Sequence, residues 1–576
     1  MTFLTVSIGL MESFPQLSVS SFNKHTPIMR HSNAFIFFFV LASFSFSTYS
    51  YAQQAPRIEW QRCLGGSKDE DGGGGPSSRC IVQTSDGGYI LTGSTVSRDG
   101  DVSGLHDTIN GDIWVVKLSS SGSIEWQKCL GGSHQSIAYC IIQTSDKGYA
   151  IAGSTSANDG DVTGWHPGFD TSFGSKYPHA DAWFIKLDSL GNIQWQKCLG
   201  GSGIDAATSI IQTSDGGYAV TGTTTSNDGD MSGNHGNYDE FVIKLSSSGV
   251  IQWQKCYGGR NGDWGVSIIQ TYDGGYITAG WTGSNDEGSF INHGHTDIYI
   301  VKIDSLGNLQ WQKCYGGSFN DEGFCILQTA DRGYVFIGYT QSSDGEVSGY
   351  HGVNQDADAW LVRIDSIGKI LWQRSLGGSR NDVGSSIIQP SDGGFIIAGS
   401  TASIDGDVIR DDPGGVWILK LNSSGIIQWQ RCLGGNKGLD NGTSIIQTND
   451  GGYALAGITS SNDGDVSGLH YFSNGAPSSD IWVIKLSPAI IDKVESTTPE
   501  QSLHQPYPNP STGEVRIDIS SSLIPQKLDF FDALGNRCYP QYTLENNIAL
   551  VNVQSLASGI YMVKVGSQTT PFIVQH

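Results

Sequence analysis

The stretch Ile193-Gln194-Trp195-Gln196-Lys197-Cys198 contains the signature that decides the fold. Its Trp-Gln-(Lys/Arg) core recurs along most of the chain at long, nearly regular intervals. Such a period is interpreted before any local motif, because it fixes the architecture of the whole chain. The signature tryptophans are Trp60, Trp126, Trp195, Trp253, Trp311, Trp372 and Trp429.

Each repeat predicts four short strands. In the second repeat they cover residues 141–144, 149–153, 181–187 and 193–198. Short β-rich runs bounded by Asp-Gly and Ser-Gly pairs are hairpin signals. The third strand is apolar at consecutive positions, which indicates a sheet covered on both faces, as in sheets stacked around an axis.

The two ends of the repeat region complement each other. In the last repeat the third strand, residues 480–486, is followed by Ser487-Pro488 and by no fourth strand. At the other end, residues 58–63 have the pattern of a fourth strand, but no first, second or third strand precedes them. We therefore expect residues 58–63 to pair beside 480–486. The predicted fold is all-β: a seven-bladed β-propeller over residues 57–488, closed by its N-terminal strand.

Three details of the repeat predict how it is held together. The signature tryptophans should be buried and stabilise the ring without disulfides. One repeat position is cysteine in six repeats, which favours small buried thiols, although a pair such as Cys129 with Cys140 stays open. The turn between the first two strands ends in a glycine that should supply positive φ, namely Gly88, Gly148, Gly217, Gly275, Gly333, Gly394 and Gly452.

Composition and the N-terminus restrict the partners. The formal charge of −23 argues against nucleic acid and anionic membranes, since both attract Lys/Arg patches. Residues 29–52 predict a signal peptide, with a basic start, an apolar run and small residues before a cleavage site. Residues 1–28 would then be an upstream extension that is not native. The apolar run is short for a bilayer, so we expect no transmembrane segment in the mature protein.

The C-terminal region carries three motif blocks after a polar linker at residues 489–506. In their order they resemble the C-terminal sorting domain (type A) of the type IX secretion system, and the repeats resemble bacterial extracellular β-propeller repeat proteins. The resemblance implies a small β-sandwich at residues 507–576, contact with the secretion machinery, and a secreted or outer-membrane location in a Gram-negative bacterium. The blocks supply Tyr507, Pro508, Asn509, Pro510, Gly513, Gly535, Gly559 and Tyr561.

Aromatic residues that break the repeat symmetry are the candidate binding residues. Exposed aromatic rings stack on sugar faces or fill protein pockets, although packing of a loop on itself is the alternative. The candidates, mostly from the loops between second and third strands, are Trp165, His166, Phe169, Phe173, Tyr177, Trp264, Trp281, Tyr350 and His351.

The same loops repeat an Asp-Gly-Asp phrase followed by histidine. Two carboxylates at this spacing are weak candidates for Ca²⁺ ligands, and a loop-capping turn is the alternative. For the histidines, a brace within each blade is favoured over a metal site. The Ca²⁺ candidates are Asp159, Asp161, Asp228 and Asp230.

The expected function is non-catalytic, adhesin-like binding of a carbohydrate or protein, because no catalytic signature is present and no catalytic residue is predicted. The alternative is an extracellular glycosidase or polysaccharide lyase. It would need paired carboxylates about 5–10 Å apart at the propeller mouth. The carboxylates available for this are Asp205, Asp263, Asp321, Asp382 and Asp440.

Overall fold

The computed structural model describes residues 53–70, 81–106, 109–170, 177–286, 291–409, 415–436, 438–491, 513–518, 528–532, 537–545, 548–565 and 568–574. Every helix or strand assigned in these ranges is a β-strand, which confirms the all-β class. The predicted extension and signal peptide (1–52) and linker residues 492–506 lie outside the described residues.

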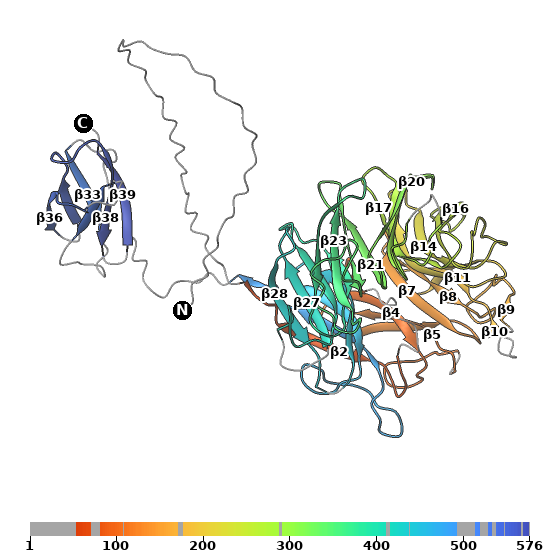
Figure 1. The fold of residues 1–576 in the computed structure, drawn as a ribbon. Coiled ribbons are helices and arrows are strands. Elements are labelled where there is room, and N and C mark those ends of the chain that lie inside the picture. The colour runs from red at the N-terminus through yellow and green to blue at the C-terminus, as the bar shows by residue number, and fades with distance from the viewer. Residues whose placement is uncertain are drawn as a thin grey trace, which may run out of the picture. The chain divides into compact units, whose positions relative to one another are not determined.

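Residues 53–491 form seven four-stranded antiparallel sheets, drawn from red to blue in Figure 1. The first four sheets consist of β3 (Ile81–Gln83), β4 (Tyr89–Thr95), β5 (Asp112–Leu118) and β6 (Ile124–Leu130); β7 (Ser136–Gln143), β8 (Tyr149–Thr155), β11 (Asp181–Leu187) and β12 (Ile193–Leu199); β13 (Asp205–Gln212), β14 (Tyr218–Thr224), β15 (Asp239–Leu245) and β16 (Ile251–Tyr257); and β17 (Asp263–Gln270), β18 (Tyr276–Thr282), β19 (Asp297–Ile303) and β20 (Leu309–Tyr315).

The next two sheets repeat this order, and the seventh takes its fourth strand from the start of the chain. They consist of β21 (Asp321–Gln328), β22 (Tyr334–Thr340), β23 (Asp358–Ile364) and β24 (Ile370–Leu376); β25 (Asp382–Ile388), β26 (Phe395–Thr401), β27 (Gly415–Leu421) and β28 (Ile427–Leu433); and β29 (Asp440–Gln447), β30 (Tyr453–Thr459), β31 (Asp480–Leu486) and β2 (Ile58–Leu64). Two-residue pairs join β1 (Gln53–Gln54) to β32 (Ile490–Ile491) and β9 (Phe169–Asp170) to β10 (Tyr177–Pro178).

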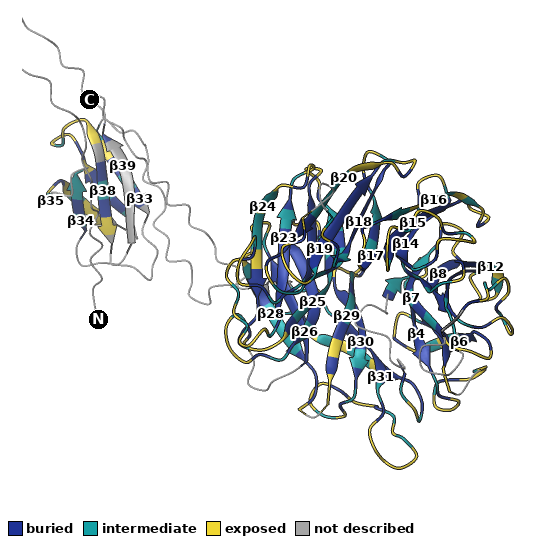
Figure 2. Ribbon diagram, turned by 45° about the vertical axis from the view of Figure 1, so that its right-hand side comes forward, coloured by how far each residue is buried: buried dark blue, intermediate teal, exposed yellow. Residues whose placement is uncertain are grey.

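Strand β2 pairs antiparallel with β31, from Ile58 opposite Leu486 to Leu64 opposite Ile481. The indole N–H of Trp482 on β31 donates to Gln61 on β2 at 2.8 Å. The first strands of neighbouring sheets lie next to one another, as β13, β17 and β21 do. The strand interiors are buried and the turn tips exposed (Figure 2), so the core lies between the stacked sheets.

The third strand of each sheet places a fully buried aromatic ring in this core. The glutamine of the Trp-Gln signature accepts the hydrogen bond of that ring wherever it has a polar hydrogen, at 2.7–3.0 Å. Phe241 has no such hydrogen, and Gln254 accepts from Ser232 instead. The seven rings are Trp114, Trp183, Phe241, Tyr299, Trp360, Trp417 and Trp482.

Gln373→Ala should therefore destabilise the protein by about 1–3 kcal/mol, because it leaves the buried N–H of Trp360 without an acceptor. Gln254→Ala is the matched control, since Phe241 needs no acceptor, and should cost less than half as much. The urea midpoint measures both. In a Trp360→Phe background the Gln373 substitution should lose most of its effect, and an unchanged effect would contradict this role.

The signature tryptophans have a different place from the one predicted. Only Trp429 is buried, and the other six are half-buried. Each ring instead packs against Tyr or Phe at the start of the second strand in the next sheet, with centroids 5.6–6.3 Å apart. The signature tryptophan thus joins neighbouring sheets, while the glutamine that follows it accepts the hydrogen bond of the buried aromatic ring in the core.

The expected role of the glycine that ends each first turn is wrong. Positive φ, between 66° and 85°, occurs one residue earlier, where Lys147 and Arg332 adopt it as readily as glycine does elsewhere. The glycine itself is required by close approach. A Cβ on Gly88 would lie 2.3 Å from the carbonyl oxygen of Leu118, and the other six glycines meet the equivalent oxygen at 2.3–2.5 Å.

The described cysteines are all free thiols, so Cys129 and Cys140 do not form a disulfide. Burial raises the pKa of the Cys129 thiol to about 12. The thiols therefore stay protonated and pack as small apolar groups.

The C-terminal region contains two further sheets. One has β33 (Glu514–Asp518), β37 (Ile548–Asn552) and β36 (Gln541–Glu545); the other has β35 (Arg537–Cys538), β34 (Asp529–Asp532), β38 (Gly559–Val565) and β39 (Gln568–Val574). One buried cluster takes side chains from both sheets, among them Val515, Phe530, Val551 and Val563.

Candidate functional site

The repeated histidines brace the second-to-third-strand loops. Each one bonds through Nδ1 to a buried aspartate that begins the third strand, at 2.6–2.9 Å, and its backbone N–H donates to the same carboxylate. His166 and His351, which sequence suggested for binding, belong to this set. The pairs are His106–Asp112, His166–Asp181, His235–Asp239, His293–Asp297, His351–Asp358 and His470–Asp480.

The brace also reaches the neighbouring sheet. His166 Nε2 lies 3.8 Å from Asp230, which belongs to the acidic phrase of the next repeat. Burial raises the pKa of Asp181 to about 6, although its bonds to His166 oppose the shift. Burial lowers the pKa of His470, but its bond to Asp480 outweighs this and leaves that pKa raised.

The acidic phrases cap backbone N–H groups. Asp159 accepts from Ser133 N at 2.6 Å and Asp228 from Ser202 N at 2.7 Å. Asp161 accepts from Gly131 N at 3.3 Å. The capped groups belong to the connection that enters the same sheet, so this geometry favours the turn interpretation over Ca²⁺. Among the described residues, no three His, Cys, Asp or Glu side chains gather into a group that could hold a metal ion.

The five carboxylates that an enzyme would need also accept hydrogen bonds from the connecting loops. Asp205, Asp263, Asp321, Asp382 and Asp440 are 0–3% exposed. Each accepts from a glycine N–H at 2.7–3.0 Å and from a serine hydroxyl at 2.7–2.9 Å. Burial raises the pKa of Asp263 and Asp321 to about 6. These five carboxylates therefore stabilise the connecting loops through their hydrogen bonds.

The long loop of the second repeat packs on itself. The indole N–H of Trp165 donates to His179 O at 2.8 Å, and Tyr350 in a later loop donates its hydroxyl hydrogen to Asp356 O at 2.6 Å. Phe169 and Tyr177 lie in the paired strands β9 and β10. Phe173 lies outside the described residues.

Trp264 and Trp281, in contrast, are brought together. They are opposite one another on β17 and β18, with ring centroids 5.5 Å apart and planes inclined by 20°. Tyr238, just before β15, stacks on Trp264 at 5.3 Å and 22°. Phe324 on β21 meets Trp281 edge-on at 6.3 Å, and Tyr339 on β22 follows Phe324 at 5.8 Å.

These five rings, here called the aromatic ladder, connect three consecutive sheets, and all of them are half-buried. The residue pairs that match Trp264–Trp281 hold no aromatic ring in four other sheets, whereas the fifth sheet has Glu322–Tyr339. The four pairs are Ile137–Ser154, Ala206–Thr223, Val383–Ser400 and Asn441–Ile458. Two of the five rings, Trp264 and Trp281, are predicted from the sequence. The signal that could have found a third ring is the same symmetry break at Tyr339, which lies inside a strand at the slot of Trp281.

Glu322 lies opposite Tyr339 on the paired strand and is half-buried. Burial raises the pKa of Glu322, and its hydrogen bond with Tyr339 opposes the shift. The Glu322 carboxylate therefore flanks the ladder, beside the phenol of its last ring, Tyr339.

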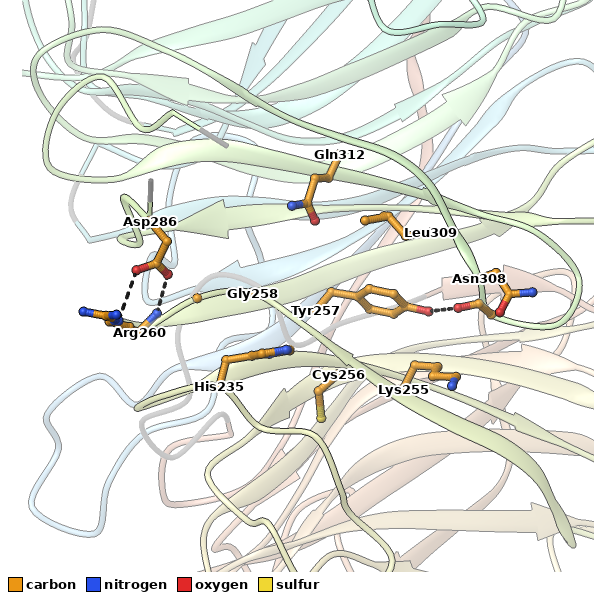
Figure 3. Close-up of a pocket in the computed structure, with 12 residues that line it drawn as sticks. His235, Lys255, Cys256, Tyr257, Gly258, Arg260, Asp286, Asn308, Leu309 and Gln312 are labelled. Atoms are coloured by element: carbon orange, nitrogen blue, oxygen red, sulfur yellow. Dashed lines mark hydrogen bonds and ion pairs between the residues drawn. The ribbon is translucent and has the colours of Figure 1, made fainter. Parts of the chain in front are cut away.

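A groove of about 660 Å³ lies between the third and fourth sheets (Figure 3). His235, Lys255, Arg260 and Asp286 contribute to its wall, and Arg260 pairs with Asp286. A similar groove of about 490 Å³ between the fifth and sixth sheets includes His351 and Asp407. Because equivalent residues line both, the groove follows from stacking of the repeats and marks no single site.

Known proteins are similar to the chain in sequence and in structure. Over 134 residues it is 23% identical to the regulatory protein FlaEY of Caulobacter vibrioides, and this match covers 23% of the chain but only 14% of that relative. Similar solved structures include the WD40 β-propeller domain of Doa1 (11% identity, 75% of this chain and 97% of that chain, TM-score 0.36) and the WD40 domain of Neurospora crassa Pan2 (9%, 72% and 89%, 0.38).

The C-terminal region matches a family model directly. Among the motif residues, Gly513, Gly559 and Tyr561 are described, and Tyr561 donates its hydroxyl hydrogen to Ala557 O at 3.0 Å. Tyr507, Pro508, Asn509, Pro510 and Gly535 lie outside the described residues. No helix in the described part of the chain is long and apolar enough to cross a membrane. Residues 505–575 match the model of the secretion system C-terminal sorting domain, which identifies this region as a type IX secretion sorting domain.

Proposed function

We propose that the protein is a β-propeller exported by the type IX secretion system that binds a carbohydrate or protein outside the cell without catalysis. The sorting-domain match supports export. The half-buried aromatic ladder supports binding and is the observation that carries it, because Trp264, Trp281 and Tyr339 stand at slots that the third and sixth sheets fill with smaller residues.

The architecture in this proposal is a seven-bladed wheel over residues 57–488, sealed by β2. The pairing of β2 with β31 supports it. A linker at 489–506 precedes a β-sandwich at 507–576, supported by the cluster shared between its two sheets. Residues 29–52 are the signal, residues 1–28 are not native, and the mature protein is released or held at the outer membrane of a Gram-negative bacterium.

The glycosidase or lyase alternative has less support, because its five candidate carboxylates are buried and hydrogen-bonded within their own loops. Adhesion and carbohydrate binding fit the acidic, aromatic-bearing surface better. Release of reducing ends from polysaccharides by the purified chain would favour the alternative, whereas saturable binding without product supports the proposal.

Removal of residues 505–576 should reduce the amount of protein outside the cell to background, because the address for export is lost. The protein should accumulate in the periplasm, as signal cleavage does not depend on this domain. Immunoblots of culture medium, outer membrane and periplasm measure the distribution. A chain truncated in this way that still reaches the surface at normal levels would contradict the export route.

A further inference from the structure

We propose that the aromatic ladder of Tyr238, Trp264, Trp281, Phe324 and Tyr339 is the binding site for a neutral, hydroxyl-rich glycan chain. The inference rests on the proposed binding function and assigns its site and ligand class. The ladder is one connected group of rings, with successive centroids 5.3–6.3 Å apart.

The shape of the ladder fits an extended ligand. Tyr238, Trp264 and Trp281 have nearly parallel planes, inclined by 22° and 20°, and the next two rings continue the line across the following sheet. All five rings are half-buried and come from neighbouring sheets, so the row presents apolar ring edges across three sheets. The C–H face of a pyranose is apolar while its edges carry hydroxyl groups, so a row of sugars can cover aromatic surface and keep its polar edges hydrated.

The charges nearby disfavour anionic ligands. The chain carries a formal charge of −23, and Glu322 flanks the ladder at Tyr339. Asp263 begins the strand that holds Trp264, and Glu240 lies behind the same strand, against Gly265. A uronic-acid polymer or a nucleic acid would meet a repulsive field, whereas sugar hydroxyls can donate to Glu322 and to the Tyr339 oxygen.

The ladder is not required by the fold. At the slots of Trp264 and Trp281 the third sheet has Ala206 and Thr223, and the sixth has Val383 and Ser400, with the same strand pairing. The five rings are half-buried, and three of them, Trp264, Trp281 and Tyr339, stand at slots that the third and sixth sheets fill with smaller residues. Part-exposed aromatic rings at such slots indicate a partner.

The test uses the full chain in native gels that contain a neutral β-glucan, mannan or xylan, with polygalacturonate as the anionic comparison. At least one neutral polymer should retard the protein. Trp264→Ala and Trp281→Ser, which introduce residues found at these slots in other sheets, should weaken that retardation at least tenfold, equivalent to about 1.4 kcal/mol. Trp165→Phe, in a loop outside the ladder, is the matched control and should retain binding.

Unchanged thermal unfolding of the variants shows that any loss of retardation is local. The inference is overturned if no neutral polymer retards the protein, if only polygalacturonate does, or if both ladder variants bind as well as the unaltered chain. Binding to a surface protein that Trp281→Ser leaves intact would overturn the ladder site while the wider binding function stands.

Discussion

A chain without residues 53–64 is expected to lose cooperative unfolding of the whole repeat region. The deletion removes β2, exposes the edge of β31, and leaves the buried Trp482 N–H without Gln61. It also removes Trp60, which packs on Tyr89 of the next sheet. Lost apolar burial and one orphaned donor together cost about 5 kcal/mol or more. The remaining contacts of the seventh sheet with the first, made by β29, β30 and β31, lose the support of β2.

A circular permutant separates the role of the strand from that of the chain end. Leu486 is opposite Ile58, so a copy of the turn at residues 422–426 can join them as it joins β27 to β28. Restoring β2 in this position should return the unfolding temperature to within a few degrees of the unaltered protein. Calorimetry follows both chains. A deletion chain that unfolds like the full protein would show that β2 does not seal the wheel.

The pairing of β2 with β31 could be anticipated because it depends on a count. A period of four strands that leaves one strand at the N-terminal end and three at the C-terminal end has one simple antiparallel solution, and β2 pairs with β31 in that way. The turns were harder to predict. Both Gly87 and Gly88 are glycine in the first repeat, and only the backbone shows that Gly87 has positive φ while Gly88 avoids the Leu118 carbonyl.

The binding candidates illustrate what sequence could not supply. Trp165 and Tyr350 stand out in loops, yet each donates its polar hydrogen to a carbonyl of its own loop. Phe324 and Tyr339 lie inside strands, where an aromatic residue is typical of the hydrophobic core. Their partnership with Trp281 depends on contact between separate sheets, and a local pattern does not encode that contact.

Glu240 gives the second large prediction, because it carries a carboxylate at a position that is otherwise apolar. It is fully buried; its Oε1 accepts from Thr221 at 3.0 Å, and its Oε2 has no hydrogen-bond partner. Burial raises the pKa of Glu240 to about 7, and the charges of Asp263 and Asp239 act in the same direction. In the other six sheets the residue equivalent to Glu240 is apolar: Ile113, Ala182, Ile298, Ala359, Val416 and Ile481.

The raised pKa makes Glu240 a source of instability at neutral pH. Below the unfolded pKa of 4.5 the carboxyl is protonated in both states and costs nothing by ionisation. As pH rises the unfolded chain ionises first, so stability falls until the folded pKa near 7 is passed. The free energy of unfolding is therefore lower at pH 8 than below pH 4.5 by about 3 kcal/mol.

Glu240→Gln should remove this pH-dependent part while keeping the Thr221 contact. Relative to the unaltered protein, the variant should gain about 3 kcal/mol between pH 4.5 and pH 8, whatever constant cost its amide adds. Urea unfolding across this range measures the difference, and the other buried carboxylates cancel because both chains share them. Parallel profiles for Glu240→Gln and the unaltered chain would mean that water or a cation reaches Glu240 in solution.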